Sequence, residues 1–104
     1  MLKIKLFCSA GMSTSMLVTK MQEVAQTRGL DAEIAAYSEA TIHEETDNCD
    51  VALLGPQIRF MLGRAKEICD PKGVPVEAIT MQDYSMINGE KVLDSALALV
   101  KDKA

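Results

Sequence analysis

The sequence LKIKLFCSAGMSTS, residues 2–15, joins a strand-like pattern to a short polar segment that contains a cysteine. Apolar residues alternate with lysines over 2–7 before the pattern turns apolar, which predicts a short strand. The residues of 8–11, Cys-Ser-Ala-Gly, interrupt this pattern, and apolar residues then recur at helical spacing over 12–28. We therefore predict a strand, a short loop and a helix, with Cys8 at the end of the strand.

The rest of the chain continues this alternation of strands and helices. Its 104 residues, 48% of them hydrophobic, suffice for one core, so we predict a single domain, 1–104. Regular alternation of this kind predicts an α/β fold with a parallel sheet covered by helices on both faces. Pro75 suits the start of a strand or an edge strand, because it has no N–H group to donate. The further strands are predicted at 32–36, 51–54 and 74–79, and the further helices near 42, at 58–69 and at 89–101, with a loop at 80–88.

Composition argues against several classes of partner. The net charge is −4 and the 11 basic residues are scattered, so we expect no nucleic-acid partner and no membrane-surface patch. The three cysteines form no C-x-x-C pair and His43 is the one histidine, so we predict no metal site and no cofactor. No apolar run approaches the roughly 18 residues of a membrane span, and the first residues lack the pattern of a secretory signal. We expect a cytoplasmic protein with reduced thiols and no direct membrane insertion.

The loop after the first strand has the features of a phosphate site. In open α/β sheets, ligands bind beyond the carboxyl ends of the strands. Backbone N–H groups of this loop can converge on an anion at the positive end of the following helix, and the same field favours the thiolate of Cys8, the nucleophile that could attack phosphorus. Gly11 permits a close backbone approach, and hydroxyl groups add donors. We predict Cys8 as the catalytic residue and the following phosphate-binding residues: Ser9, Ala10, Gly11, Met12, Ser13, Thr14 and Ser15.

This loop departs from two better-known phosphate loops. A nucleotide-binding P-loop requires GxxxxGK[ST], but the segment has one glycine and no lysine before Lys20. A thiol phosphatase of the Cys-x5-Arg type would have an arginine at position 14, where this chain has Thr14. Without this arginine, the loop suits a carrier that passes a phosphoryl group on instead of hydrolysing it. A thiol-phosphatase-like or arsenate-reductase-like enzyme and a non-catalytic phosphate-binding module remain the alternatives.

Three blocks of the chain carry a resemblance to a known family: FCSAGMSTS at 7–15, LLGPQI at 53–58 and YSMINGEKVL at 84–93. They resemble the IIB components of the bacterial phosphoenolpyruvate-dependent sugar phosphotransferase system, lactose/cellobiose/chitobiose class, over nearly the whole chain. The resemblance implies a four-stranded parallel sheet in the flavodoxin-like order 2-1-3-4, in a three-layer sandwich similar to low-molecular-weight thiol phosphatases. Phe60 and Ser85 depart from the tyrosine and glycine of many relatives, which bears on partner or sugar preference.

The same resemblance implies a function. Cys8 would accept a phosphoryl group from a phosphohistidine of a phosphorylated IIA protein and transfer it to a sugar bound by the membrane IIC permease. The sugar would be a β-linked disaccharide such as cellobiose, chitobiose or lactose, and the protein would be a phosphotransferase peripherally associated with this permease. Gly55, Pro56 and Gln57 match the family's second loop, which lies close to the phosphate loop and is expected to shape a docking surface.

Other reactive or charged residues have plainer explanations. Cys49 borders a predicted buried strand and Cys69 lies on an apolar helix face, so packing accounts for both better than redox chemistry does. We interpret His43 as a surface residue. Arg59 and Arg64 could attract phosphate or an acidic partner, but solvation on a helix is the plainer interpretation. The acidic residues at 44, 45, 47 and 50 are interpreted as solvating a loop.

Overall fold

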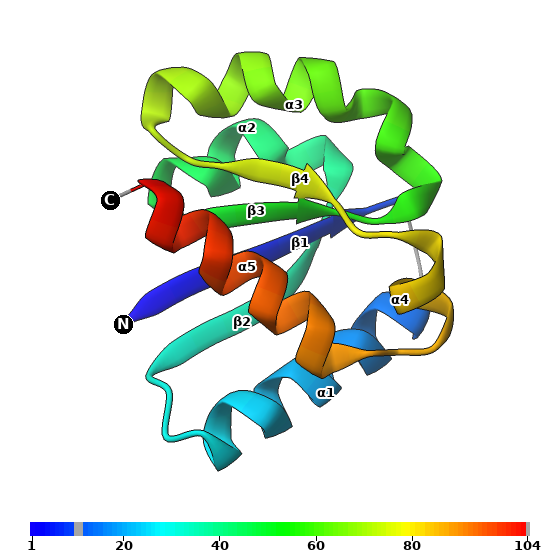
Figure 1. Ribbon diagram of the computed structural model, residues 1–104. Coiled ribbons are helices and arrows are strands. Elements are labelled where there is room, and N and C mark those ends of the chain that lie inside the picture. Colours follow the sequence, from blue (N-terminus) through cyan, green and yellow to red (C-terminus); the bar gives the residue numbers. More distant parts are fainter. Residues whose placement is uncertain (10–11, 104) are drawn as a thin grey trace.

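Four parallel strands form a sheet in the order β2-β1-β3-β4 (Figure 1). The computed structural model describes residues 1–9 and 12–103. The register pairs Leu2 with Ala32 and Ile4 with Val51, so the first strand lies inside the sheet between its second and third strands. This arrangement confirms the predicted parallel sheet and its strand order. The strands are β1 Leu2–Cys8, β2 Ala32–Ser38, β3 Val51–Leu54 and β4 Val76–Ala78.

Helices cover both faces of this sheet, which gives the predicted three layers (Figure 1). α1 Met12–Thr27 and α5 Gly89–Lys103 lie against one face, and α2 Ile42–Glu45 and α3 Leu62–Cys69 lie against the other. Short 3-10 turns flank the helices of the second face. They are η1 Glu39–Thr41, η2 Thr46–Asn48, η3 Pro56–Met61 and η4 Asp70–Lys72.

The central strand β1 supplies side chains to both layers of the core. Successive residues of a strand point to opposite faces of the sheet. Ile4 and Leu6 accordingly pack in the core beneath α1 and α5, whereas Phe7 packs in the core beneath α2 and α3. All strands run in one direction, so their carboxyl ends meet along one side of the sheet, which we call the carboxyl edge. Cys8 is the last residue of β1 and lies at this edge.

Lys5 is a buried charge that the sequence pattern alone did not identify. Its ammonium donates to the side-chain and backbone oxygens of Glu45, both at 3.0 Å, and lies 5.2 Å from the ring centroid of Tyr37. Burial alone would lower the pKa of Lys5, but the hydrogen bond to Glu45 and nearby charges outweigh it, so the net direction is upward. The acidic residues near Glu45 are therefore partly structural, since Asp47 also pairs with Lys72 at 2.7 Å.

The structure differs from the sequence-based prediction most clearly in one segment. Residues 80–88, predicted as a loop, contain the short helix α4 Met81–Ser85. Its start is capped by Thr80, whose hydroxyl accepts from the Asp83 N–H at 3.1 Å. β4 begins directly after Pro75, at the edge of the sheet, as expected for a residue without an N–H group. No helix within the described ranges is long and apolar enough to cross a membrane.

Candidate functional site

Cys8 lies where the central strand ends and the first helix is about to begin. Its side chain is 7% exposed and its thiol is free, and the register puts it beside Ser38 at the end of β2. α1 begins at Met12, and its first turn carries no acidic residue. The first N–H groups of a helix have no intrahelical partner and form its positive end. Backbone donors from Met12, Ser13 and Thr14 are therefore available close to Cys8 in the chain, whereas Ala10 and Gly11 lie outside the described residues.

The second loop, 55–57, lies directly against the cysteine. The Gly55 N–H donates to the Phe7 carbonyl oxygen at 2.8 Å, which ties this loop to the end of β1. A Cβ atom added at Gly55 would lie 3.4 Å from the Cys8 Cβ and 2.9 Å from the Gln57 Oε1. An added Cβ would therefore displace the Gln57 side chain and touch Cys8, which shows how close the loop lies to the cysteine. The structure brings Gly55 and Cys8 together, as expected for the second loop.

Thr14 is turned inward, toward the segment that follows β4. Its side chain is 2% exposed, and its Oγ1 is 2.8 Å from the Tyr84 hydroxyl. The sequence predicted a hydroxyl directed at phosphate, and the structure shows that this hydroxyl has a protein partner. Of the other predicted donors with described side chains, Ser9 and Ser15 are exposed. In the sequence, Tyr84 stands out only as the first residue of YSMINGEKVL at 84–93, the third block that carries the family resemblance.

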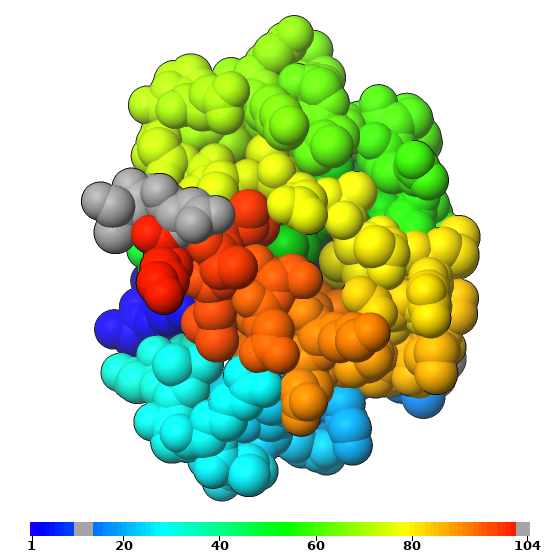
Figure 2. Space-filling view, viewed as in Figure 1, coloured from blue at the N-terminus to red at the C-terminus, as the bar shows by residue number. Residues whose placement is uncertain are grey.

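Large apolar side chains are exposed around the carboxyl edge. They come from α1, from η3 after β3, and from α4 and its end, and Phe60 is 81% exposed. Figure 2 shows the green segment of η3 and the yellow segment of α4 side by side along this edge. A hollow of about 330 Å³ lies between them, lined in part by Pro56, Arg59 and Met81. We call these exposed residues the apolar rim, and its members are Met16, Phe60, Met81 and Met86.

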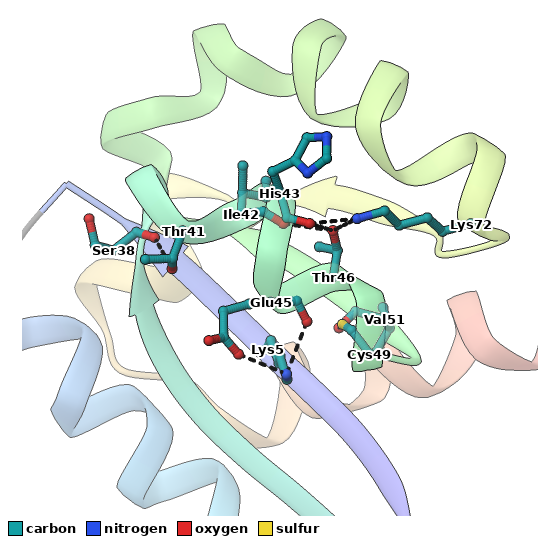
Figure 3. Close-up of polar contacts among 10 residues, drawn as sticks. All are labelled: Lys5, Ser38, Thr41, Ile42, His43, Glu45, Thr46, Cys49, Val51 and Lys72. Carbon is teal, nitrogen blue, oxygen red and sulfur yellow. Dashed lines mark hydrogen bonds and ion pairs between the residues drawn. The ribbon is translucent and has the colours of Figure 1, made fainter.

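A separate polar network lies around α2 (Figure 3). The Lys72 ammonium donates to the His43 carbonyl oxygen at 2.6 Å and to the Thr46 hydroxyl at 2.9 Å. The imidazole of His43 points away from these contacts (Figure 3), and His43 is exposed. These contacts give the segment a structural role. Within residues 1–9 and 12–103, no group of three or more His, Cys, Asp or Glu residues could hold a metal ion.

The other two cysteines are predicted to be unreactive in the folded protein. Burial raises the pKa of the Cys49 thiol to about 11, although it donates a hydrogen bond to the Val51 carbonyl oxygen at 3.1 Å (Figure 3). Burial also raises the pKa of Cys69. A thiol with a raised pKa is protonated at neutral pH, and the thiolate is the reactive form. Roughly 10⁻³ of the Cys49 side chain is therefore in the thiolate form at pH 8, and its reaction is slowed accordingly.

We therefore expect iodoacetamide at pH 8 to leave Cys49 and Cys69 unmodified in the native protein and to modify both in urea. Peptide mass measurement would quantify the labelling. The thiolate fraction of Cys49 grows about tenfold per pH unit as the pH approaches its raised pKa. The rate at which native Cys49 is labelled should therefore also increase about tenfold per pH unit above pH 8. Complete labelling of native Cys49 at pH 8, as fast as in urea, would contradict this assignment.

The fold and the site together define an α/β protein with a cysteine at the carboxyl edge of a parallel sheet, beside the N-terminus of a helix. Comparisons with known proteins identify the family. The family model for the lactose/cellobiose-specific IIB subunit of the PTS system matches residues 3–95, and the chain belongs to this family.

Relatives and solved structures agree with this assignment. The chain is 48% identical over 98 residues to the galactose-specific EIIB component of Lactococcus lactis subsp. cremoris (strain MG1363), covering 89% of this chain and 91% of that one. It is 43% identical over 100 residues to the oligo-beta-mannoside-specific EIIB component of Bacillus subtilis (strain 168), covering 96% and 97%. The solution structure of a cellobiose-specific IIB component from Borrelia burgdorferi superposes with a TM-score of 0.82 at 45% identity, covering 99% of this chain and 94% of that chain.

Membership of this family defines the activity in general terms. The protein is a phosphotransferase, a IIB component of a system for cellobiose- and lactose-type sugars. Such a component works with IIA and IIC partners in general. The chain also matches, at 26% identity, 16% of the length of a lactose-specific EIICB component from Lacticaseibacillus casei, so a related sequence forms a small share of a larger protein.

Proposed function

We propose that Cys8 carries the phosphoryl group between a phosphohistidine of a IIA protein and a sugar bound by a IIC permease. In the first step the Cys8 thiolate attacks phosphorus, the S–P bond forms, and the N–P bond breaks with its electron pair retained by the donor histidine. In the second step a sugar hydroxyl attacks phosphorus, the S–P bond breaks and the thiolate leaves. The hydroxyl proton goes to a base on the acceptor or to solvent.

The position of Cys8 is the observation that carries this proposal. Cys8 ends the central strand, just before a helix whose first N–H groups have no intrahelical partner, and Gly55 packs against it. Oriented backbone donors at a helix N-terminus stabilise phosphate without any metal or cofactor being required. We propose that residues 9–15 bind the phosphoryl group through these donors, and that loop 55–57 helps to shape the surface on which partners dock.

The residue at position 14 supports transfer over hydrolysis. In a phosphatase with the Cys-x5-Arg pattern, this position would supply a guanidinium that stabilises the transition state. Here Thr14 is buried and bonded to Tyr84, so its side chain brings no charge to the loop. A phosphocysteine with weaker electrostatic clamping should persist until an acceptor arrives.

The names of the relatives bear on the sugar. They are galactose-, cellobiose- and oligo-beta-mannoside-specific components, so related chains serve different sugars. We propose a β-linked disaccharide as the acceptor, chosen by the permease, with this chain docked at the cytoplasmic side of that permease.

Reconstitution tests the proposal. The chain would be combined with phosphorylated IIA protein, membranes containing a IIC permease and cellobiose, and the formation of sugar phosphate would be measured. We expect product only when all components are present, and negligible hydrolysis of p-nitrophenyl phosphate by the chain alone. Equal product without the chain, or rapid p-nitrophenyl phosphate hydrolysis that Cys8→Ser abolishes, would contradict a carrier role.

The apolar rim provides a docking prediction for the IIA protein. Any donor histidine that reaches Cys8 must approach the carboxyl edge, where Phe60 is exposed. Exposed aromatic residues are frequent anchors in interfaces, and truncating one typically costs about 1–2 kcal/mol of binding. We expect Phe60→Ser to raise the KM for phosphorylated IIA protein about five- to thirtyfold, with kcat unchanged, because only binding is lost.

The Phe60→Ser experiment has an internal check on folding. Phe60 contributes little to the core, so the free energy of unfolding in urea should change by no more than about 0.5 kcal/mol. An unchanged KM in this stable variant would show that the donor docks without Phe60.

A further inference from the structure

One buried hydrogen bond connects the first turn of α1 with the segment that follows β4. It joins the Thr14 Oγ1 and the Tyr84 hydroxyl oxygen, 2.8 Å apart, between residues separated by 70 positions in the chain. Thr14 is 2% exposed and Tyr84 is 6% exposed. Buried hydroxyl groups need partners, and a bond made away from water depends closely on the geometry of both elements. The bond therefore couples the start of α1 to α4.

The segment that carries Tyr84 is held firmly. The Tyr84 N–H donates to the Thr80 carbonyl oxygen at 3.0 Å, and the Asn88 N–H donates to the Asp83 carbonyl oxygen at 2.9 Å. The Tyr84 side chain belongs to the same buried core as Leu17 of α1. The hydroxyl of Tyr84 is thus presented to Thr14 from a fixed position.

A strained residue lies in the same segment. Ile87 has a φ of 51°, a left-handed conformation that a β-branched residue rarely adopts. Such strain persists only where the surrounding structure enforces it, and it is found preferentially at functional sites. The Ile87 N–H donates to the Tyr84 carbonyl oxygen at 3.2 Å, so the strained turn is directly attached to the tyrosine.

We propose that Tyr84 is a positioning residue for phosphoryl transfer, acting through Thr14 on the first turn of α1. This inference rests on the proposed role of Cys8. The N–H groups of that turn have no intrahelical partner, and their direction determines how well they meet the oxygens of a phosphoryl group on Cys8. Small errors in the direction of such donors reduce transition-state stabilisation more than they reduce binding.

The chemistry of the two hydroxyl groups supports this role. A phenolic O–H is a stronger donor than an aliphatic O–H, so Tyr84 is the better donor in the pair and Thr14 the better acceptor. We therefore assign Tyr84 as the donor and Thr14 as the acceptor, an arrangement that leaves the Thr14 hydroxyl able to donate elsewhere.

Four single variants and one double variant test the proposal. Tyr84→Phe removes one oxygen, Thr14→Val removes the partner hydroxyl, and Thr14→Ser keeps it. Tyr37→Phe is the matched control, because it removes the hydroxyl of the other tyrosine, which packs against Phe7 on the opposite side of the sheet. The measurement is kcat and KM for phosphorylation of each variant by phosphorylated IIA protein, together with the urea midpoint of unfolding.

We expect Tyr84→Phe and Thr14→Val each to lower kcat about fivefold or more with KM unchanged, as the loss of one hydrogen bond implies. Thr14→Ser keeps the hydroxyl and should therefore be faster than Thr14→Val, and Tyr37→Phe should stay within about twofold of the wild type. The variant with both Tyr84→Phe and Thr14→Val should be no slower than the slower single variant, because both changes remove the same interaction.

The outcomes separate this inference from the proposed function. If the wild type is phosphorylated on Cys8 but Tyr84→Phe has an unchanged kcat, the positioning role is wrong and Cys8 remains the carrier. If Tyr84→Phe lowers the urea midpoint but leaves kcat unchanged, the hydrogen bond contributes to stability only and the positioning role is likewise wrong. If the wild type is never phosphorylated while a Cys8→Ser control behaves identically, both proposals fail.

Discussion

Replacing Cys8 with serine should abolish sugar phosphorylation, with the rate falling by at least about 10³-fold. Serine keeps the size and position of the side chain but removes the thiol. A serine hydroxyl is scarcely ionised near neutral pH and is a poor nucleophile toward phosphorus, and the sulfur that would form the S–P bond is absent. The measurement is the initial rate of sugar-phosphate formation with phosphorylated IIA protein and permease membranes.

Cys49→Ser is the matched control for this experiment. The Cys49 thiol donates to the Val51 carbonyl oxygen, a role that a serine hydroxyl can also fill, and burial keeps this thiol protonated. We expect Cys49→Ser to retain the wild-type rate within about twofold. Retention of more than about a tenth of the rate in Cys8→Ser, with an unchanged urea midpoint, would exclude Cys8 as the nucleophile.

Replacing Gly89 with alanine should destabilise the fold by about 1–3 kcal/mol, because it forces two packed helices apart. Gly89 is the first residue of α5 and packs against Lys20 of α1. An added Cβ would lie 2.8 Å from the Lys20 Cγ and 2.9 Å from the Lys20 carbonyl carbon. The carbonyl carbon belongs to the backbone, so a side-chain rotation cannot relieve the clash. Urea unfolding gives the free-energy change.

Gly63→Ala is the control for this prediction. Gly63 lies in α3, and apart from its chain neighbours and the backbone of its own helix, nothing lies within 4 Å of an added Cβ. Alanine is favoured over glycine in a helix by about 1 kcal/mol, so this variant should be as stable as the wild type or slightly more stable. Equal destabilisation at both positions, or none at Gly89, would show that the helices α1 and α5 can accommodate a side chain at position 89 and that the predicted clash does not occur.

Local patterns in the sequence were sufficient to predict most of the architecture. The alternation at 2–7 and the apolar run at 51–54 correspond to β1 and β3, and Pro75 directly precedes the edge strand as its missing N–H group requires. The short helix α4 was missed because five residues are too few to display helical periodicity. Its cap residue, Thr80, was the available signal.

Contacts between distant residues were beyond the reach of sequence patterns. The alternation at 2–7 gives no sign that Lys5 is buried, and its partner in the structure is Glu45, 40 positions away, which accepts its hydrogen bonds. The bond between Thr14 and Tyr84 spans 70 positions and has no local signature. Charged and polar pairs of this kind are set by the packing of elements, which the periodicity of each element alone does not specify.

The candidate site was predictable to the extent that it is local. The structure confirms Cys8 at the end of β1 and brings Gly55 into contact with it. The position of Ser38 beside Cys8 follows from strand pairing and had no sequence signal. Phosphate binding by residues 9–15 stays a prediction.

The most direct test of the carrier role of Cys8 is the location of the phosphoryl group. The chain would be incubated with phosphorylated IIA protein in the absence of sugar, and intact mass measurement would be followed by mass analysis of its peptides. We predict one added phosphoryl group per chain, attached to Cys8 and lost again when permease membranes and sugar are added. A phosphoryl group on His43, on Cys49 or on no residue at all would contradict it.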